Sequence, residues 1–128
     1  MIEINNKTNH KINVKKLTAV ISRFIVFYKL KDFSVSVAFV GDKAMREANS
    51  VYRSLDKPTD VLSFPKLNEI LIDYAQIRRQ ARELKKKTED ELIFILVHGL
   101  LHLIGRRDHT EKLRLEMIAE GEAFLKKM

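Results

Sequence analysis

Three of the four histidines of the chain lie close together late in the sequence, at a spacing that suits a metal ion. His98 and His102 are four residues apart in an apolar stretch, so a helix would project both from one face, with Cα atoms about 6 Å apart. His109 follows Gly105, a residue that lets the chain turn back toward the pair. Because catalytic zinc takes three protein ligands and keeps one position open, we predict one zinc ion (Zn²⁺) on His98, His102 and His109.

The residue after the first histidine separates this pattern from that of the H-E-x-x-H zinc peptidases. Those enzymes use the glutamate after the first histidine as their general base, and Gly99 occupies that place here. The sequence therefore disfavours a peptidase of that mechanism. Glycine inside a helix costs about 1 kcal/mol relative to alanine, so Gly99 indicates a close approach of a substrate, of another backbone or of a packed neighbouring element.

Basic residues accompany the histidines. Three neutral imidazoles would leave zinc with its full double charge, which suits an anionic substrate such as a phosphodiester and lowers the pKa of a bound water to about 7. We predict that Arg53 clamps a phosphate and that Arg106 and Arg107, beside the third ligand, play a similar part. The formal net charge of +7 fits a polyanionic partner, although an ordinary solvated surface explains it equally well.

One small domain of mixed α/β (α+β) class is predicted to position these residues. Hydrophobic periodicity indicates four strands and five helices in the order β-α-β-α-β-β-α-α-α, which predicts a small mixed sheet with helices packed on it over residues 1–128. The expected strands are residues 2–5, 33–39, 61–64 and 70–72, and the expected helices are residues 13–29, 42–53, 73–86, 89–104 and 110–127. Asp42 is the expected N-cap of the second helix, Thr88 with Glu91 forms a capping box for the fourth, and Gly105 ends that helix.

Composition narrows the classes of protein further. A chain of 128 residues with 45% hydrophobic and 32% charged residues can bury a core and stay in solution. The absence of cysteine excludes disulfides, iron–sulfur clusters and thiol catalysis, so any metal must use His, Asp or Glu. No apolar run approaches the roughly 20 residues of a membrane span, and the N-terminus lacks a signal-peptide pattern. We therefore expect a cytoplasmic protein with no membrane partner.

Two motifs resemble those of the YbeY family of bacterial endoribonucleases. The first is YRSLDKPTDVLSFP at residues 52–65, and the second is HGLLHLIG at residues 98–105, followed by Asp108 and His109. The resemblance implies a metal-dependent ribonuclease that acts on single-stranded RNA in the maturation of the 16S rRNA 3′ end and in ribosome quality control. It also implies zinc on the three histidines, an important arginine at Arg53 and contact with the small ribosomal subunit.

The sequence departs from the usual family pattern near the third ligand. His109 comes eleven residues after His98, one more than is usual, and Asp108 occupies the tenth position. Either the loop bulges by a residue or Asp108 takes the ligand role. We favour His109, because loops absorb an insertion readily and imidazole suits zinc. Two further departures are Glu69, where the family usually has Asp, and Arg106, where it usually has an aromatic residue.

Three functions remain open on this basis. The first is a zinc-dependent, single-strand-specific endoribonuclease, in which Arg53 and His98 act in catalysis and Arg106 and Arg107 bind RNA. The second is a non-catalytic factor that binds RNA or the ribosome and uses zinc only to hold its loop in place, because no side chain is an unambiguous general base. The third is a small zinc hydrolase that acts on another phosphoester or on an amide.

Overall fold

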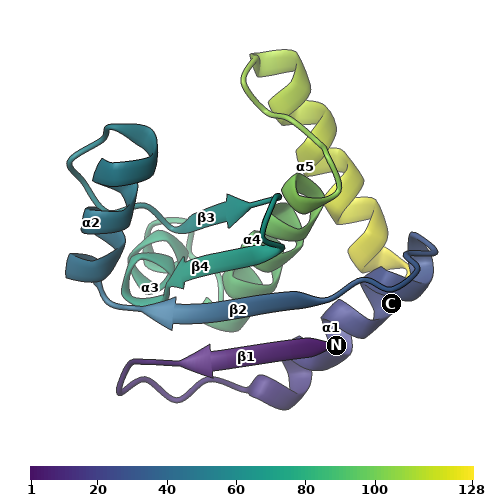
Figure 1. Cartoon of the computed structure of the whole chain (residues 1–128), viewed down its shortest axis with the longest axis horizontal. Helices are drawn as coiled ribbons and strands as arrows, with labels where there is room; N and C mark the ends of the chain where they lie inside the picture. The colour runs from purple at the N-terminus through teal and green to yellow at the C-terminus, as the bar shows by residue number, and fades with distance from the viewer.

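A four-stranded mixed sheet forms the frame of the molecule (Figure 1), in a computed structural model that describes residues 1–128. The strands lie in the order β1-β2-β4-β3. The pairs β1–β2 and β2–β4 are parallel, and β3 is antiparallel to β4. The bounds are Ile2–Asn6 for β1, Val35–Val40 for β2, Val61–Phe64 for β3 and Glu69–Asp73 for β4. β3 is thus an edge strand, as the proline directly after it predicts.

Five helices pack around this sheet. In Figure 1, α1, α3 and α4 cover one face, α5 leans against α4, and α2 stands beyond the end of β2. The bounds are Val14–Phe27 for α1, Asp42–Arg53 for α2, Tyr74–Glu83 for α3, Thr88–Leu103 for α4 and Glu111–Lys126 for α5. The element order and the mixed sheet confirm the predicted α+β class. None of the five helices has the length and apolar character needed to cross a bilayer.

The core lies between the sheet and its helical layer. Val35, Val37 and Phe39 alternate inward along β2 and are at most 3% exposed, which is the period-two pattern predicted from the sequence. α4 is apolar on nearly all sides, because β3, β4, α1, α3 and α5 all contact it. The histidines therefore stand on the most enclosed helix of the molecule.

Gly99 allows α4 to lie unusually close to the edge strand. A Cβ atom at this position would come within 3.2 Å of both Ser63 Oγ and Val61 Cγ2. The Ser63 hydroxyl also donates a hydrogen bond to the Gly99 carbonyl at 3.0 Å. Of the explanations that the sequence left open for Gly99, the structure supports a packed neighbouring element.

Polar side chains begin three of the helices. Asn13, Asp73 and Thr110 each accept a hydrogen bond from the backbone N–H three residues later, at the starts of α1, α3 and α5. These bonds satisfy donors that have no partner within the helix. The helix boundaries predicted at these residues agree with the structure to within a few residues.

Two of the predicted caps are wrong. Asp42 is the first residue of α2 and Gly41 is its N-cap, without a side-chain hydrogen bond. The capping box of Thr88 and Glu91 does not form, and α4 begins at Thr88. The Glu91 carboxylate instead pairs with Lys86 at 2.9 Å and accepts from the Gln80 amide at 3.1 Å. Because Glu91 is 3% exposed, these partners in the interior outcompete the helix end.

Asp73 is a buried carboxyl group whose charge is costly. It ends β4, caps α3 and is 0% exposed. Burial, together with the neighbouring carboxyl group of Asp42, raises the pKa of Asp73 from 3.8 to about 7. Asp42 itself is held ionised, because hydrogen bonding to Arg79 lowers its pKa to about 2.

This raised pKa predicts that Asp73 makes stability depend on pH. The folded state prefers the protonated carboxyl, so its contribution to stability is complete below about pH 4 and is lost as pH rises to about 7. The melting temperature of the wild type, relative to that of Asp73→Asn, should therefore fall between these values and level off above them. Thermal unfolding followed by circular dichroism measures both. A difference that stays constant from pH 4 to pH 8 would contradict this assignment.

Candidate metal centre and cleft

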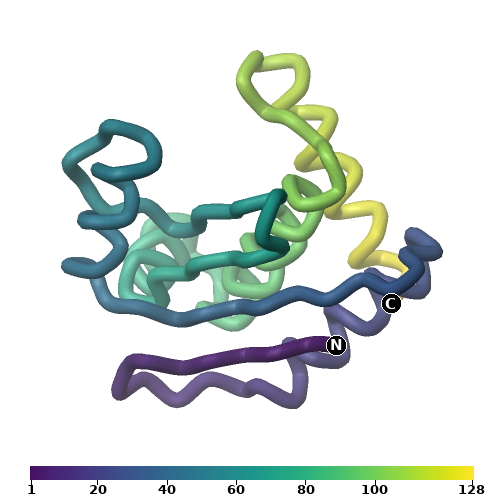
Figure 2. The backbone as a smooth tube through the Cα atoms, in the orientation of Figure 1, coloured from purple at the N-terminus to yellow at the C-terminus, as the bar shows by residue number.

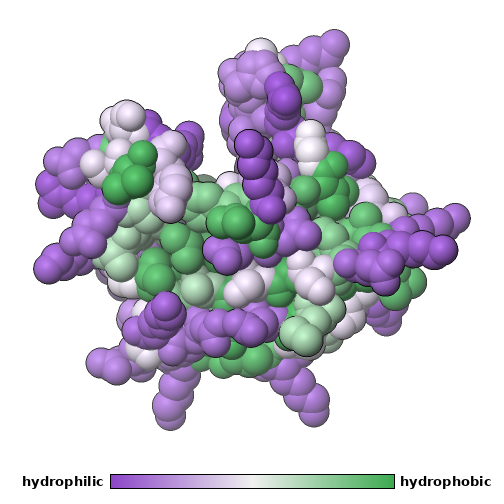
Figure 3. Space-filling view, viewed as in Figure 1, coloured by the Kyte–Doolittle hydropathy of each residue, from purple (hydrophilic) through white to green (hydrophobic).

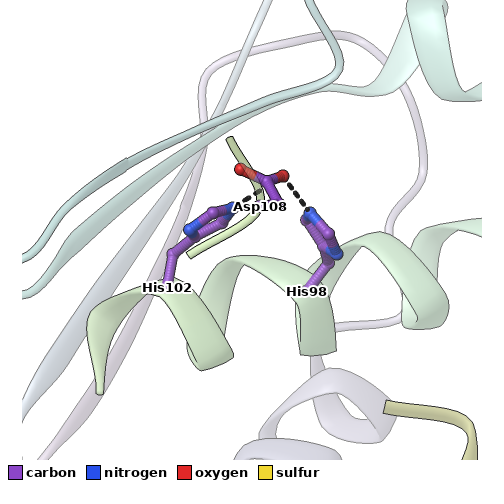
Figure 4. Close-up of side chains that lie close together, drawn as sticks. All are labelled: His98, His102 and Asp108. Atoms are coloured by element: carbon purple, nitrogen blue, oxygen red, sulfur yellow. Dashed lines mark hydrogen bonds and ion pairs between the residues drawn. The ribbon is translucent and has the colours of Figure 1, made fainter. Parts of the chain in front are cut away.

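Two histidines and an aspartate converge at the end of α4 (Figure 4). His98 Nε2 lies 3.1 Å from Asp108 Oδ2, and His102 Nε2 lies 3.3 Å from the same oxygen. The ligand atoms of the three residues all lie within 4.8 Å of one another. Each side chain is partly buried, with exposed fractions of 17% for His98, 25% for His102 and 37% for Asp108.

The turn after α4 brings Asp108 to the histidines. Gly105 adopts a positive φ of 101°, a conformation that disfavours other residues. Its N–H donates to the His102 carbonyl at 3.1 Å, and the Arg106 N–H donates to the Leu101 carbonyl at 3.0 Å. This pair of bonds is the Schellman arrangement, which ends a helix and reverses the chain. Gly105 therefore ends α4 as predicted, and the chain passes back beside the histidine face.

His102 is oriented for metal binding through its second nitrogen. His102 Nδ1 lies 3.1 Å from the Arg106 carbonyl oxygen, which can only accept a hydrogen bond. Nδ1 thus carries a proton, and when the ring is neutral its Nε2 is an acceptor that faces the Asp108 carboxylate. Two acceptors 3.3 Å apart require a cation between them, either a proton or a metal ion. Metal-binding histidines commonly use such a contact to a backbone carbonyl.

The donor set fits a zinc ion. With metal–ligand bonds of about 2.0–2.1 Å, two donors on a tetrahedral ion lie roughly 3.3 Å apart. The two separations from Asp108 Oδ2 to the imidazole nitrogens, 3.1 and 3.3 Å, are close to that value. Two imidazoles and one carboxylate also leave room for a further ligand, which is typical of catalytic zinc sites. His98, His102 and Asp108 are therefore the residues that could hold the metal.

Asp108 is predisposed to be ionised in this setting. Burial alone would raise its pKa, but the charge of His102 and a hydrogen bond with His98 outweigh burial and place the pKa below its ordinary value. An ionised carboxylate is the form that binds a cation.

The predicted three-histidine set needs a correction at its third member. His109 is exposed and does not belong to the convergent group, in which Asp108 takes the third place. The reason lies in the hydrogen bonds of Arg106, which tie the loop to Leu101 and His102 so that the carboxylate two residues later faces the imidazoles. A zinc ion on this set would keep one net positive charge rather than two.

The metal-site residues lie on the wall of a cleft of about 700 Å³. Figure 2 shows two loops, after α2 and after α4, that extend on the same side of the sheet beyond β3. In the space-filling view the surface is hollowed between these two projections, which are largely hydrophilic (Figure 3). The cleft is lined by β3, α4, the end of α2, the loop after α4, and α5. Its arginines are Arg53, Arg106, Arg107 and Arg114.

Arg53 is the last residue of α2, and the loop that follows it is well anchored. Arg46 forms a two-point ion pair with Asp56, with N–O distances of 2.7 and 3.1 Å. The buried Asn49 amide donates to the Lys57 carbonyl at 2.8 Å. Arg53 itself lines the cleft and has no ion-pair partner. The structure thus places Arg53 across the same cleft as the metal-site residues.

The sequence reasoning missed two residues of the cleft. Arg114 reaches it from α5 and pairs with Glu111 at 2.8 Å. Asp60 lies on the opposite wall, where its carboxylate accepts from the Val61 N–H at 2.8 Å and from the Gln80 amide at 3.2 Å. Asp60 lies within the motif of residues 52–65, which was its only sequence signal, whereas Arg114 carries no local signal because the packing of α5 alone brings it to the cleft.

The fold and this site define the class of the protein as a small α+β protein with a group of possible metal ligands in an arginine-lined cleft. The YbeY family model, described as endoribonuclease YbeY, matches residues 3–128. The chain belongs to the YbeY family, as the motifs in its sequence indicate.

Curated relatives and a solved structure agree with this family. The endoribonuclease YbeY of Acholeplasma laidlawii is 35% identical, and the alignment covers 98% of this chain and 96% of the relative. That of Nautilia profundicola is 32% identical and covers 100% of this chain and 91% of the relative. The solution structure of a Thermotoga maritima protein matches with a TM-score of 0.69 at 30% identity, over 98% of this chain and 87% of that one.

The corrected ligand set predicts that zinc affinity depends on Asp108 but not on the adjacent His109. Asp108→Ala should weaken Zn²⁺ binding by more than the roughly 10–100-fold that the loss of an outer-shell partner costs. His109→Ala should keep wild-type affinity, because His109 is outside the group. Competition with a chromophoric chelator measures both affinities. Weak binding by His109→Ala with unchanged binding by Asp108→Ala would restore the three-histidine set.

Proposed function

We propose that this protein is a zinc-dependent endoribonuclease that cleaves single-stranded RNA. One observation carries the proposal: the group formed by His98, His102 and Asp108 lies on the wall of a cleft that also holds four arginines. Phosphodiesters are the substrates that such a combination suits, since arginine pairs with phosphate and a metal ion acts on its oxygen. The family, whose curated members are named endoribonucleases, supports the same reading.

The residues of the cleft divide into two roles. Arg53 and Arg107 have no ion-pair partner and are available to hold RNA phosphates on either side of the metal-site residues. His98, His102 and Asp108 hold the ion, and the Arg106 carbonyl keeps the proton of His102 on Nδ1. When bound, zinc would supply Lewis acidity to a phosphodiester oxygen or lower the pKa of an attacking water. Binding through phosphates suits a flexible single strand, which can follow the cleft.

The cellular role that we propose is maturation of the 16S rRNA 3′ end and ribosome quality control, on the small ribosomal subunit in the cytoplasm. The net charge of +7 supports a polyanionic partner of this kind. Relatives named endoribonuclease YbeY support the ribonuclease activity that this role requires.

A second candidate is a non-catalytic RNA-binding or ribosome-binding factor in which zinc stabilises the loop. One feature of the cleft favours it: both of its carboxylates are already engaged, Asp60 by three hydrogen bonds and Asp108 by the histidines. No carboxylate is thus free to act as a general base. This candidate predicts salt-dependent binding of RNA with no cleavage.

A time course with end-labelled single-stranded RNA separates the two candidates. We expect cleavage by the zinc-loaded protein, loss of cleavage with a chelator, and recovery when zinc is restored. His98→Ala should lose both zinc and cleavage, which also controls for a contaminating nuclease. Unchanged cleavage by His98→Ala would overturn the metal-site mechanism, and tight binding without cleavage by the zinc-loaded wild type would favour the second candidate.

Arg53→Ala should lower cleavage about a hundredfold while zinc stays bound, because removal of one positioned donor at a reacting phosphate typically costs this much. Arg23→Ala is the matched control, since Arg23 is exposed on α1 and does not line the cleft. Single-turnover cleavage and the zinc content of each purified variant give the two readouts. Equal cleavage by the Arg53 and Arg23 variants would remove Arg53 from the mechanism.

A further inference from the structure

Arg106 differs from the other arginines of the cleft in the contacts of its side chain. Its Nε donates to both carboxylate oxygens of Glu120 on α5, at 2.9 and 3.1 Å. The same carboxylate accepts a hydrogen bond from the Tyr28 hydroxyl at 2.7 Å. The Arg106 guanidinium also lies over the Tyr28 ring, 5.7 Å from its centroid. Arg106 thus joins the loop after α4 to α5 and to the end of α1.

These contacts persist over a wide pH range. Hydrogen bonding to Arg106 lowers the pKa of Glu120, although burial opposes the shift. Burial and the hydrogen bond to Glu120 raise the pKa of Tyr28 to about 12, so its hydroxyl remains a donor. An isolated surface ion pair is worth little, but the shared carboxylate and the stacked ring restrain Arg106 further.

The backbone N–H and carbonyl of Arg106 are also both hydrogen-bonded, and they face the metal-site residues. Its N–H donates to Leu101, and its carbonyl accepts from Nδ1 of His102 at 3.1 Å. Arg106 therefore fixes a proton of His102 on Nδ1. It also fixes the course of the loop, and with it the position of Asp108 two residues later. A side chain fixed to α5 holds this backbone at the correct distance from α4.

We propose that the ion pair between Arg106 and Glu120 is a positioning device that sets the affinity of the metal site, rather than a contact to RNA. The inference rests on the proposed metal-dependent function. It assigns different tasks to two adjacent arginines, since Arg107 has no ion-pair partner and lines the same cleft. Arg107 binds the RNA substrate, and Arg106 positions the metal ligands.

Zinc affinity measured by chelator competition is the primary test. Arg106→Ala and Glu120→Gln should each weaken Zn²⁺ binding about tenfold, the lower end of the range for partners that orient ligands. The double variant should be no weaker than either single variant, because both remove the same contact. Glu116→Gln, one turn earlier on α5 and without an ion-pair partner, should keep wild-type affinity. Thermal unfolding shows whether each variant is folded.

Cleavage of single-stranded RNA separates positioning from RNA contact. At saturating zinc, Arg106→Ala should recover the wild-type KM for RNA, whereas Arg107→Ala should raise KM at unchanged zinc affinity. A raised KM for Arg106→Ala at saturating zinc, or wild-type zinc affinity in Arg106→Ala and Glu120→Gln, overturns the proposal.

A measurement on the metal-free protein distinguishes failure of the proposal from failure of the proposed function. ¹⁵N NMR of the histidine rings, recorded at a pH at which the rings are neutral, should show His102 protonated on Nδ1 in the wild type and a mixture of tautomers in Arg106→Ala. If the wild type binds no zinc, the metal-dependent function fails, and the NMR result alone then supports or overturns positioning by Arg106. An unchanged tautomer in Arg106→Ala counts against it.

Discussion

The contact between α4 and β3 at Gly99 determines where the metal-site side chains emerge. A Cβ at Gly99 would lie only 3.2 Å from side-chain atoms of Ser63 and Val61, and the hydrogen bond from Ser63 to the Gly99 carbonyl adds a polar contact to the apolar packing. His98 and His102 lie on either side of this contact in sequence, and both line the cleft together with residues of β3. A side chain at this position would require the Ser63 and Val61 side chains to give way by a few tenths of an ångström, which tightens the packing between the histidine helix and β3.

Beyond this contact, the site depends on how α4 ends. The turn at Gly105 brings the chain back, the Arg106 carbonyl orients His102, and Asp108 completes the group. The other wall of the cleft is formed independently, where Asn49 and the pair of Arg46 with Asp56 hold the loop after Arg53. Two loops that are distant in sequence thus meet across one cleft, and each has its own anchors within the fold.

Local sequence patterns predicted what local physics decides. Alternation along β2, the starts of α1, α3 and α5 and the stop at Gly105 depend on neighbouring residues, and the structure agrees with these predictions. The third metal ligand was predicted wrongly as His109. Bonds of the loop to α4 and α5 decide which of the two adjacent residues, Asp108 or His109, faces the histidines. The capping role predicted for Glu91 was wrong for a similar reason, since its carboxylate pairs with Lys86 and Gln80 in the interior instead. Arg114 reaches the cleft only through the packing of α5.

The exchange of an imidazole for a carboxylate changes how the charge of the cleft is divided. An ionised Asp108 attracts a cation more strongly than a neutral ring does, but it leaves a bound zinc ion with one net positive charge instead of two. The attraction for a phosphodiester must then come more from the arginines, and only those without internal partners can supply it fully. Arg53 and Arg107 meet this condition, whereas Arg106 is engaged by Glu120 and Arg114 by Glu111. Substrate affinity should therefore follow the salt dependence of phosphate contacts, while metal affinity follows the geometry of the loop after α4.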